Sequence, residues 1–554
     1  MNHRSWHRHY DPGVPTSIRY PHIIVPDIVQ IPAKTYPDKP ALVFEGKEIT
    51  FWELRTQILR FANALTGLDI KKGDRVGLHL PTCPQYVISY YALLSLGAII
   101  VNLNPLYTVE ELQGTAHTTG MSALITSDMS LETARILVKT ADIKKVVFAR
   151  LGDYSGQSPK KANASVEPEE GWHLFSRLME DCRNTKKPRV SISPDDVAVI
   201  QFTGGTTGIP KGAMLTHKNI VVSAVQLTFW LSPLLQLIAP ERRLVPVHLP
   251  LYHVYGNLIM NWAIYSCTRQ ILIPRFQIDD IIELVKSLKE ILFFPTVATV
   301  ISALLNHPKI NELDLGKKLT LINSGGGPTA LHLMEQLDDM GIYTSQGWGM
   351  SETAALGTST PIFSIKKINS IGIPYPDNDV RLVDLESGLE DVPRGEPGEI
   401  IIKSPTVMKG YWNNQEGTDE QLKDGWLYTG DIAIQDEDDF LFIVDRKKDM
   451  VISGGFNIYP REVDEVLFQH PKVEFGIAVG VPDEYRGETL KAFIVLKKGQ
   501  SATDREIIDF CREKLAPYKV PKLVEFRDSL PQSSVGKVLR KELRAEEIQK
   551  TAKK

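Results

Sequence analysis

Cysteine is scarce in this chain, and neither sign of charge is in large excess. The cysteines, Cys83, Cys182, Cys267 and Cys511, stand far apart and show no Cys-x-x-Cys or Cys/His spacing. This argues against a disulfide framework or a structural zinc site and fits a reducing cytoplasm. Lys and Arg number 63 against 67 Asp and Glu, which gives a formal net charge of -4. The balance provides no basic surface of the kind that binds nucleic acid.

Long apolar runs are also missing. No uninterrupted run reaches the roughly 20 residues that cross a bilayer. The richest stretch, Val254–Tyr265, is broken by Gly256, Asn257 and Asn261, so we expect a buried core element or pocket wall there. The N-terminal segment MNHRSWHRHYDPGVP is polar and contains proline, unlike a signal peptide. We expect a cytoplasmic protein and leave peripheral membrane contact open.

The chain of 554 residues is too long for one hydrophobic core. From Asp74 onward, short β-rich runs alternate with longer amphipathic ones. RVGLHL is followed by the helical YVISYYALLSLGA and by AIIVNLN, and further strand-like runs are SALITS, KKVVFA, VAVIQF and RQILIP. This alternation predicts an α/β fold built from βαβ units with mainly parallel sheets. Residues 153–170, rich in Ser, Pro, Lys and Glu, are predicted to be an exposed insertion.

The composition changes after about Asp445. The charged DRKKD precedes VISGGFNIYPREVDEVL, the compact strands GIAVGV and LKAFIVLKK, and a helix near REIIDFCREKL. We predict a large N-terminal domain of βαβ subdomains over residues 1–445. A small, mobile α+β domain over residues 446–554 follows it through the charged linker.

The strongest local signal is QFTGGTTGIPKG, residues 201–212, directly after the apolar strand VAVIQF. Such a loop turns backbone N–H groups toward one point and forms an anion-binding nest. Its glycines permit close approach, its threonines add hydroxyl donors, and its lysine adds a mobile positive charge. No Gly-Lys-Ser/Thr closes it, so it is not a Walker loop. The predicted polyphosphate contacts are Thr203, Gly204, Gly205, Thr206, Thr207, Gly208 and Lys211.

This loop resembles the phosphate-binding signature of the adenylate-forming superfamily: acyl-CoA synthetases, aryl-CoA ligases, luciferases and peptide-synthetase adenylation domains. The family commonly has Ser where this chain has Gly204, and the Gly-Gly version is most similar to the fatty acyl-CoA synthetase branch. The resemblance spans roughly Ala41 to Arg540, with each motif in the family's order. It implies ATP and Mg²⁺ as cofactors and coenzyme A as a further substrate.

The segment QGWGMSET, residues 346–353, resembles the family's adenine and metal motif. Trp348 stands where Tyr is usual and can still stack on adenine. Ser351 keeps a hydroxyl for the α-phosphate, and the resemblance makes Glu352 the Mg²⁺ ligand together with Thr206. SGGGP, residues 324–328, resembles the family's small-residue turn. The implied nucleotide contacts are Gly325, Gly326, Gly327, Gln346, Gly347, Trp348, Gly349 and Ser351.

Three further motifs complete the resemblance. YTGD, residues 428–431, resembles the ribose motif, in which Asp431 would accept both sugar hydroxyls and Arg446 would also reach the ribose. LPQSSVGK, residues 530–537, resembles the loop of the catalytic lysine, Lys537. In the resemblance His253 would stand at the entrance of the acyl pocket, although a lone His in an apolar stretch is equally often a core residue. In the resemblance Lys448 is the hinge, and rotation about it presents Gly454, Gly455 and Asn457 to coenzyme A.

The resemblance implies an AMP-forming acid–CoA ligase that works through an acyl-adenylate. Peptide-synthetase domains hold the substrate's amino group with a pocket carboxylate, and LPLYHVYGNLIMNW has none, so an α-amino acid is disfavoured. WHRHYDPGVP and VNLNPLYTVEEL resemble the medium- to long-chain fatty acyl group. Alternatives are an aryl or alicyclic acid–CoA ligase, a luciferase-like oxygenase and a non-catalytic adenylate-binding homologue. A homodimer is left open.

Overall fold

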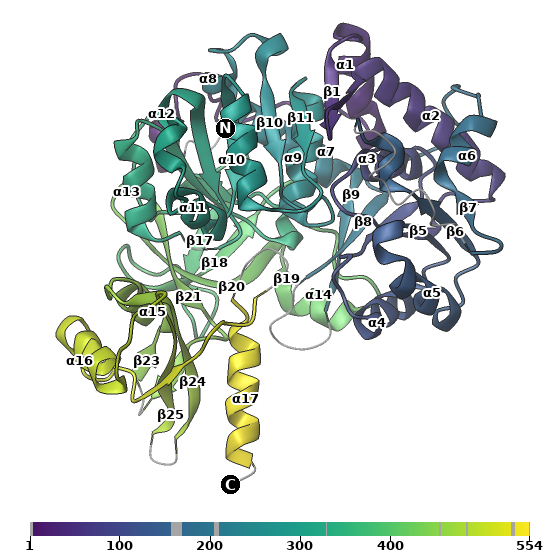
Figure 1. The fold of residues 1–554 in the computed structure, drawn as a ribbon. Helices are drawn as coiled ribbons and strands as arrows, with labels where there is room; N and C mark the ends of the chain where they lie inside the picture. Colours follow the sequence, from purple (N-terminus) through teal and green to yellow (C-terminus); the bar gives the residue numbers. More distant parts are fainter. Residues whose placement is uncertain are drawn as a thin grey trace.

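The computed structural model describes residues 4–156, 169–203, 210–327, 329–453, 456–483, 486–532 and 538–552. Within these ranges the strands form five sheets. Four sheets and their helices make a large body, and the fifth lies with α15, α16 and α17 at the lower left of Figure 1.

The largest sheet has the strand order β7-β6-β5-β3-β4-β8-β9 and is parallel except between β8 and β9. Its strands are β3 (Arg75–His79), β4 (Ile99–Asn102), β5 (Ala123–Ser127), β6 (Lys145–Ala149), β7 (His173–Leu174), β8 (Val197–Phe202) and β9 (Gly212–Thr216). The helices of this part are α2 (Phe51–Gly67), α3 (Pro84–Ser95), α4 (Val109–Thr119), α5 (Leu131–Thr140) and α6 (Phe175–Asp181). The strands and helix predicted from RVGLHL through VAVIQF are thereby confirmed.

Two more sheets are mixed, with both parallel and antiparallel pairs. One has the order β10-β11-β1-β2, with β1 (Pro40–Phe44), β2 (Lys47–Thr50), β10 (Leu244–Val247) and β11 (Arg269–Leu272). The other runs β12-β13-β14-β15-β16, with β12 (Ile291–Thr296), β13 (Leu319–Ser324), β14 (Tyr343–Trp348), β15 (Thr358–Ser359) and β16 (Ile373–Pro374). Strand β1 pairs with β2, and β15 with both β14 and β16, in the antiparallel sense, while the other pairs are parallel. Because β12, β13 and β14 are parallel, their carboxyl ends meet at one edge.

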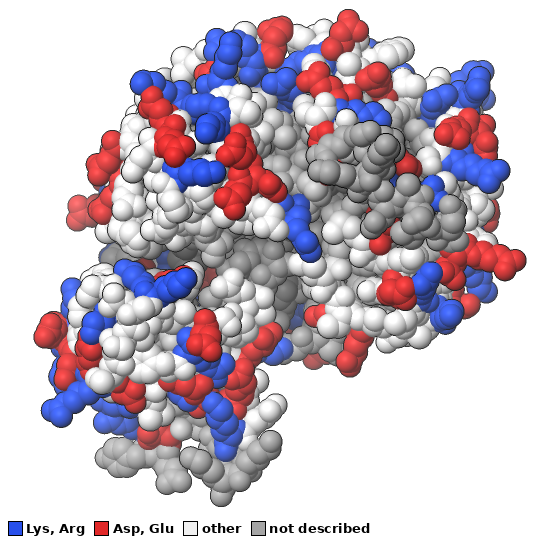
Figure 2. Space-filling view, viewed as in Figure 1, with Lys and Arg blue, Asp and Glu red and all other residues white. Residues whose placement is uncertain are grey.

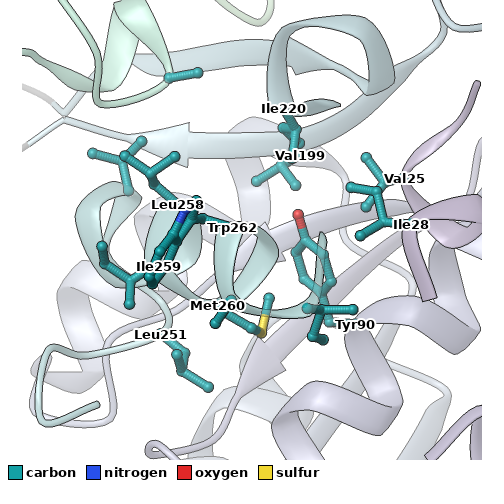
Figure 3. Packing of buried hydrophobic residues seen from close by; sticks show 14 of the residues in the cluster. Val25, Ile28, Tyr90, Val199, Ile220, Leu251, Leu258, Ile259, Met260 and Trp262 are labelled. Carbon is teal, nitrogen blue, oxygen red and sulfur yellow. The ribbon is translucent and has the colours of Figure 1, made fainter. Parts of the chain in front are cut away.

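The helices around these sheets are α1 (Gln30–Thr35), α7 (His217–Trp230), α8 (Ser232–Leu235), α9 (Val254–Tyr265), α10 (Ile278–Ser287), α11 (Ala298–Leu305), α12 (Leu315–Lys318) and α13 (Leu331–Asp339). Helix α9 is central to the core, with Leu258, Ile259, Met260 and Trp262 all buried. Figure 3 shows these side chains among residues of the N-terminal segment, α3, β8 and α7. The prediction of a buried core element over Val254–Tyr265 is confirmed.

The fourth sheet is antiparallel, with the order β17-β18-β20-β19 and β21 paired to β20. Its elements are β17 (Asp379–Val383), β18 (Gly398–Lys403), α14 (Gln415–Gln421), β19 (Leu422–Lys423), β20 (Trp426–Gln435) and β21 (Leu441–Arg446). It departs from the parallel arrangement expected for the N-terminal part. Short turns join β19 to β20 and β20 to β21, and such turns can connect only antiparallel neighbours.

The fifth sheet has the order β23-β22-β25-β24, with β26 parallel to β25. Its elements are β22 (Val451–Ser453), β23 (Phe456–Ile458), α15 (Pro460–Phe468), β24 (Val473–Asp483), β25 (Gly487–Leu496), α16 (Asp504–Lys514), β26 (Leu523–Phe526) and α17 (Arg540–Ala552). Its own apolar cluster includes Val463, Leu467, Ala492 and Ile507. The predicted strands GIAVGV and LKAFIVLKK and the helix near REIIDFCREKL are β24, β25 and α16.

Several other expectations can be compared with the structure. All the cysteines are free, and Cys83, Cys267 and Cys511 are buried. Most of the predicted insertion, residues 157–168, lies outside the described residues. In the part of the chain that the structure describes, no helix is long and apolar enough to cross a membrane. Figure 2 shows acidic and basic side chains interspersed on the visible face.

Candidate active site

The glycine and threonine loop connects β8 to the antiparallel strand β9. At its base the Thr203 N–H donates to the Lys211 carbonyl at 3.0 Å, which closes the ends of the loop against each other. The Lys211 Nζ lies 5.2 Å from the centre of the Tyr411 ring and 3.7 Å from Glu420 Oε2. Gly204, Gly205, Thr206, Thr207 and Gly208 lie outside the described residues.

The small-residue turn follows β13 at the edge where the parallel strands end. The Gly325 N–H donates to the Thr296 carbonyl of β12 at 3.1 Å. Gly326 has a φ of +77°, a conformation that side chains disfavour. A side chain on Gly325 would press on the Tyr255 ring, 3.1 Å from an added Cβ. Gly325, Gly326 and Gly327 therefore leave backbone accessible beside β14.

The adenine motif occupies the end of β14. The Trp348 ring lies against Gly357, where an added Cβ would approach the ring to 2.3 Å. Gln346, on the same strand, is buried, and its side-chain nitrogen has no hydrogen-bond partner among the described residues. A buried amide that lacks a partner fits a site whose ligand supplies an acceptor. Gly349 lies too close to the Ala355 carbonyl for any side chain.

Asp431 joins the adenine and ribose motifs. Its Oδ2 accepts a hydrogen bond from Trp348 Nε1 at 2.8 Å, and its Oδ1 lies 3.0 Å from Arg446 Nε. Asp431 and Arg446 face each other in the register of β20 and β21. The Asp431 charge raises the pKa of Arg446, whereas burial and the Arg446 charge lower the pKa of Lys448.

Glu352 lies in a short 3-10 helix, Ser351–Thr353, just after the adenine motif. Its side chain is buried, and its Oε1 accepts a hydrogen bond from Tyr411 Oη at 2.7 Å. Burial raises the pKa of Glu352 although the Tyr411 hydrogen bond opposes the shift. A nearby cation would therefore stabilise the charged carboxylate.

The donor set around Glu352 suits Mg²⁺ carried by a nucleotide. Within the described ranges, no group of three or more His, Cys, Asp or Glu side chains could hold a metal ion. Mg²⁺ typically takes one or two protein carboxylates and completes its shell with water and phosphate oxygens. A single buried carboxylate near a polyphosphate loop fits that pattern, and an all-protein cage does not.

A cavity of about 50 Å³ lies between α9 and the ends of β13 and β14. His253 is the N-cap of α9, and its Nδ1 accepts from the Tyr255 N–H at 3.3 Å. Tyr255 Oη donates to Asn323 Oδ1 at 2.6 Å. The lining includes His253, Tyr255, Phe293, Gly325 and Trp348, with no charged side chain among its described residues.

The structure thus brings together the predicted residues Gly325, Gly326, Gly347, Trp348 and Gly349 around the cavity that His253 also lines. Lys537, Gly454 and Gly455 lie outside the described residues, as does the Asn457 side chain. Residues that sequence reasoning missed are Tyr411 and Asn323. The one local signal near Tyr411 was Gly410, because a glycine can mark a place where another part of the chain approaches closely.

Comparisons with known proteins identify the family of this chain. The family model described as AMP-binding enzyme matches residues 29–412, and the model described as AMP-binding enzyme C-terminal domain matches residues 462–537. A long-chain-fatty-acid–CoA ligase of Bacillus subtilis (strain 168) is 38% identical, with 99% of each chain covered. A protein of the same name from Escherichia coli O6:H1 is 40% identical, with 98% of each chain covered.

A solved structure extends the likeness to the fold. It is the O-succinylbenzoate coenzyme A synthetase of Bacillus subtilis in complex with ATP and magnesium ion. Its TM-score is 0.77 at 29% sequence identity, with 93% of this chain and 99% of that chain covered. The chain therefore belongs to the AMP-binding enzyme family, as an AMP-forming acid–thiol ligase with a large N-terminal and a small C-terminal domain.

Proposed function

We propose that this chain converts a medium- to long-chain fatty acid, ATP and coenzyme A into acyl-CoA, AMP and diphosphate through an acyl-adenylate. The single observation that carries the proposal is the neutral, mostly apolar cavity that is lined by both His253 and Trp348. One wall of this cavity belongs to the adenine motif, so a carboxylate at its mouth would lie beside a bound nucleotide. The two relatives named as long-chain-fatty-acid–CoA ligases support the same acid.

Adenylation requires a carboxylate to approach an already anionic α-phosphate, so charge neutralisation is the main catalytic demand. Lys211 and the loop donors Thr203, Thr206 and Thr207 would hold the phosphates. Ser351 would donate to the α-phosphate, and Lys537 would pair with both the acyl carboxylate and that phosphate. Trp348 would cover the adenine while Gln346 donates to it, and Asp431 and Arg446 would bind the ribose.

Magnesium fits this assignment through Glu352 and Thr206. When bound with ATP it would withdraw charge from the phosphate oxygens and ease departure of diphosphate. The carboxylate oxygen then forms a bond to the α-phosphorus, and the bond from that phosphorus to the bridging oxygen breaks. The product is a mixed anhydride of the acid and AMP.

Thioester formation needs other groups at the same anhydride. The coenzyme A thiol loses its proton to solvent, and its sulfur bonds to the acyl carbon. The bond from that carbon to the bridging oxygen breaks, so AMP departs with the former carboxylate oxygen. We propose that residues 446–554 rotate about Lys448 for this step and withdraw Lys537. Gly454, Gly455 and Asn457 would then face the pantetheine arm.

The cavity walls also define which acids are refused. A buried ammonium would find no counter-charge among the described lining residues, and an unpaired buried charge is costly. Amino acids should therefore bind poorly. Each methylene buried from a straight-chain acid should contribute about 0.8 kcal/mol.

An aryl or alicyclic acid is the second candidate, and one observation favours it. The cavity is small, about 50 Å³, and the rings of Tyr255 and Trp348 form part of its wall, so a long acyl chain would need some displacement of that wall. A compact ring would need less movement. The relative that acts on O-succinylbenzoate has a similar fold.

A panel of acids distinguishes the two candidates. AMP release would be measured with straight-chain acids from acetate to palmitate, with benzoate and cyclohexane carboxylate, and with two amino acids. We expect kcat/KM to rise with chain length to an optimum at medium or long chain and then to fall. A ring acid that exceeds every straight-chain acid would replace the fatty acid in the proposal. Acetate as the best substrate would show that Tyr255 or Trp348 blocks the cavity.

We also propose a cytoplasmic enzyme that contacts membranes peripherally and forms a homodimer. Fatty acids partition into bilayers, so membrane contact would bring the enzyme close to its substrate. Sedimentation of the free protein would give its mass and so test the homodimer. Sedimentation with lipid vesicles would test membrane contact through the fraction of the protein that pellets.

A further inference from the structure

Tyr411 lies between the phosphate loop and the metal carboxylate without belonging to either motif. The backbone of Tyr411 pairs with that of Ala213 of β9 in an isolated antiparallel β-bridge. Next to it, the Trp412 N–H donates to the Gly212 carbonyl at 2.8 Å, and the Met214 N–H donates to the Gly410 carbonyl at 2.9 Å. These bonds fix Tyr411 to the strand that leaves the phosphate loop.

The hydroxyl of Tyr411 points at Glu352. Tyr411 is buried, and its Oη donates to Glu352 Oε1 at 2.7 Å. The same hydroxyl contacts the side-chain amide of Gln421. A hydroxyl has one proton, and an amide fits in either orientation, so Gln421 can donate to Oη while Oη donates to Glu352. The carboxylate is thus held by a phenol that is itself held by α14.

Lys211, the lysine of the phosphate loop, lies over the ring face of Tyr411. Lys211 Nζ lies 5.2 Å from the ring centre, within the range of a cation–π contact. One side chain therefore touches two charged groups of the proposed ATP site, Lys211 with its ring face and Glu352 with its hydroxyl.

We propose that Tyr411 is a positioning residue that orients the Glu352 carboxylate toward the magnesium ion bound with ATP. The inference rests on the proposed function, because it requires a nucleotide–metal complex at Glu352. Groups that hydrogen-bond a metal ligand fix its orientation, and their loss commonly weakens metal binding about 10- to 100-fold.

The test measures binding and not turnover. A non-hydrolysable ATP analogue is titrated by calorimetry into the full chain and into Tyr411→Phe, with Mg²⁺ and again with excess EDTA. The Phe variant keeps the ring and its lysine contact and loses only the hydroxyl. Tyr154→Phe is the matched control, since Tyr154 is a half-buried tyrosine whose hydroxyl donates to Gln57 at 2.5 Å in another part of the fold.

We expect Tyr411→Phe to weaken binding about tenfold or more in Mg²⁺ and to leave binding in EDTA unchanged, with Tyr154→Phe matching the parent in both. Glu352→Gln and the double variant complete a cycle. If Tyr411 acts through Glu352, the Phe change has no further effect in the Gln background. Equal losses with and without Mg²⁺, no loss at all, or additive losses in the double variant would each overturn the proposal.

The parent protein separates this inference from the function it rests on. Mg²⁺-dependent binding by the parent together with an unaffected Tyr411→Phe variant rejects only the role of Tyr411. A parent that binds the analogue equally with Mg²⁺ and EDTA rejects the magnesium site at Glu352, and a parent that does not bind the analogue at all rejects the proposed ATP site.

Discussion

The Asp431 carboxylate joins the adenine motif to the β20–β21 hairpin. One oxygen accepts from the Trp348 indole, and the other pairs with Arg446. A ribose that binds Asp431 must share or replace the indole hydrogen bond. Trp348 therefore both lies at the proposed adenine site and donates to the carboxylate proposed to accept from the ribose.

Asp431→Asn should weaken ATP binding. The substitution keeps the shape of the side chain and removes the charge that strengthens hydrogen bonds to the sugar and pairs with Arg446. Hydrogen bonds to a charged group contribute about 1.5–3 kcal/mol, so we expect affinity for ATP to fall roughly 10- to 100-fold. Calorimetry gives the affinity. Asp391→Asn, which removes the carboxylate of an exposed pair with Arg381 on the same sheet, should leave it unchanged, and an equal loss there would refute the assignment.

Lys537→Ala should slow adenylation far more than thioester formation. Removing one electrostatic contact to the reacting centre costs about 10²–10³ in rate. The two half-reactions are assayed separately, the first as diphosphate release and the second with supplied acyl-AMP and coenzyme A. Lys498→Ala, an exposed lysine in the same part of the chain, controls for folding. A similar slowing of both half-reactions would remove Lys537 from the adenylation step.

Motif residues could be predicted at this scale, but their partners could not. Trp348, Asp431 and Glu352 lie inside short runs whose residue order is itself informative. Tyr411 and Glu352 are 59 positions apart, and Tyr255 and Asn323 are 68 apart. Such pairs depend on how sheets and helices pack, which no local pattern of residues encodes.

At the scale of elements, the segment between β21 and β22 connects the fourth sheet to the fifth. β21 ends at Arg446 in the fourth sheet, and β22 begins at Val451 in the fifth. Between them the Asp449 and Met450 N–H groups both donate to the Arg446 carbonyl. This tight turn contains Lys448, so a backbone rotation there would move the whole fifth sheet.

Lys448→Pro should impair the second half-reaction. Proline fixes φ near -65°, so the backbone at 448 could no longer change conformation freely. We expect acyl-AMP to accumulate while transfer to coenzyme A falls at least tenfold, as measured by single-turnover quench experiments. Lys448→Ala, which removes the side chain but keeps backbone freedom, should retain transfer. Intact transfer in the proline variant would place the pivot elsewhere or make rotation unnecessary.

The parallel elements were predictable because each buried strand is a short apolar run next to a longer amphipathic helix. The antiparallel sheet of β17 to β21 was not predicted. Buried and half-exposed positions alternate over the first half of β20, whereas β18 is buried almost throughout, and neither pattern reveals which neighbours pair. Pairing there depends on turn geometry and on the direct pairing of β18 with β20, which α14 and β19 separate in the sequence.

At the scale of the whole molecule, burial shifts the pKa values of His79, His217 and His248 in the large body more strongly than those of the other described histidines. Burial lowers the pKa values of His79, His217 and His248 to about 4, against 6.5 for an exposed histidine. Between these values the unfolded chain binds more protons than the folded one. Their stabilising contribution is therefore complete above pH 6.5 and declines as the pH falls toward 4.

We expect the melting temperature to fall between pH 6.5 and pH 5, a range in which exposed carboxylates are still mostly ionised. His217→Asn should make this decline shallower, because one titrating group is lost while an acceptor for the Val25 N–H remains possible. Calorimetric melting at several pH values, with the parent protein and the variant in parallel, gives both slopes. A melting temperature that does not change across this range would contradict the account of the buried histidines.

The central claim is that the acid is activated by bonding its own oxygen to the α-phosphorus of ATP. The most direct test uses a fatty acid whose carboxylate carries oxygen-18, incubated with the enzyme, ATP, Mg²⁺ and coenzyme A, with the nucleotide product analysed by mass spectrometry. We predict AMP that contains one oxygen-18 atom, together with diphosphate and acyl-CoA. Unlabelled AMP, or ADP with labelled phosphate, would contradict an acyl-adenylate intermediate.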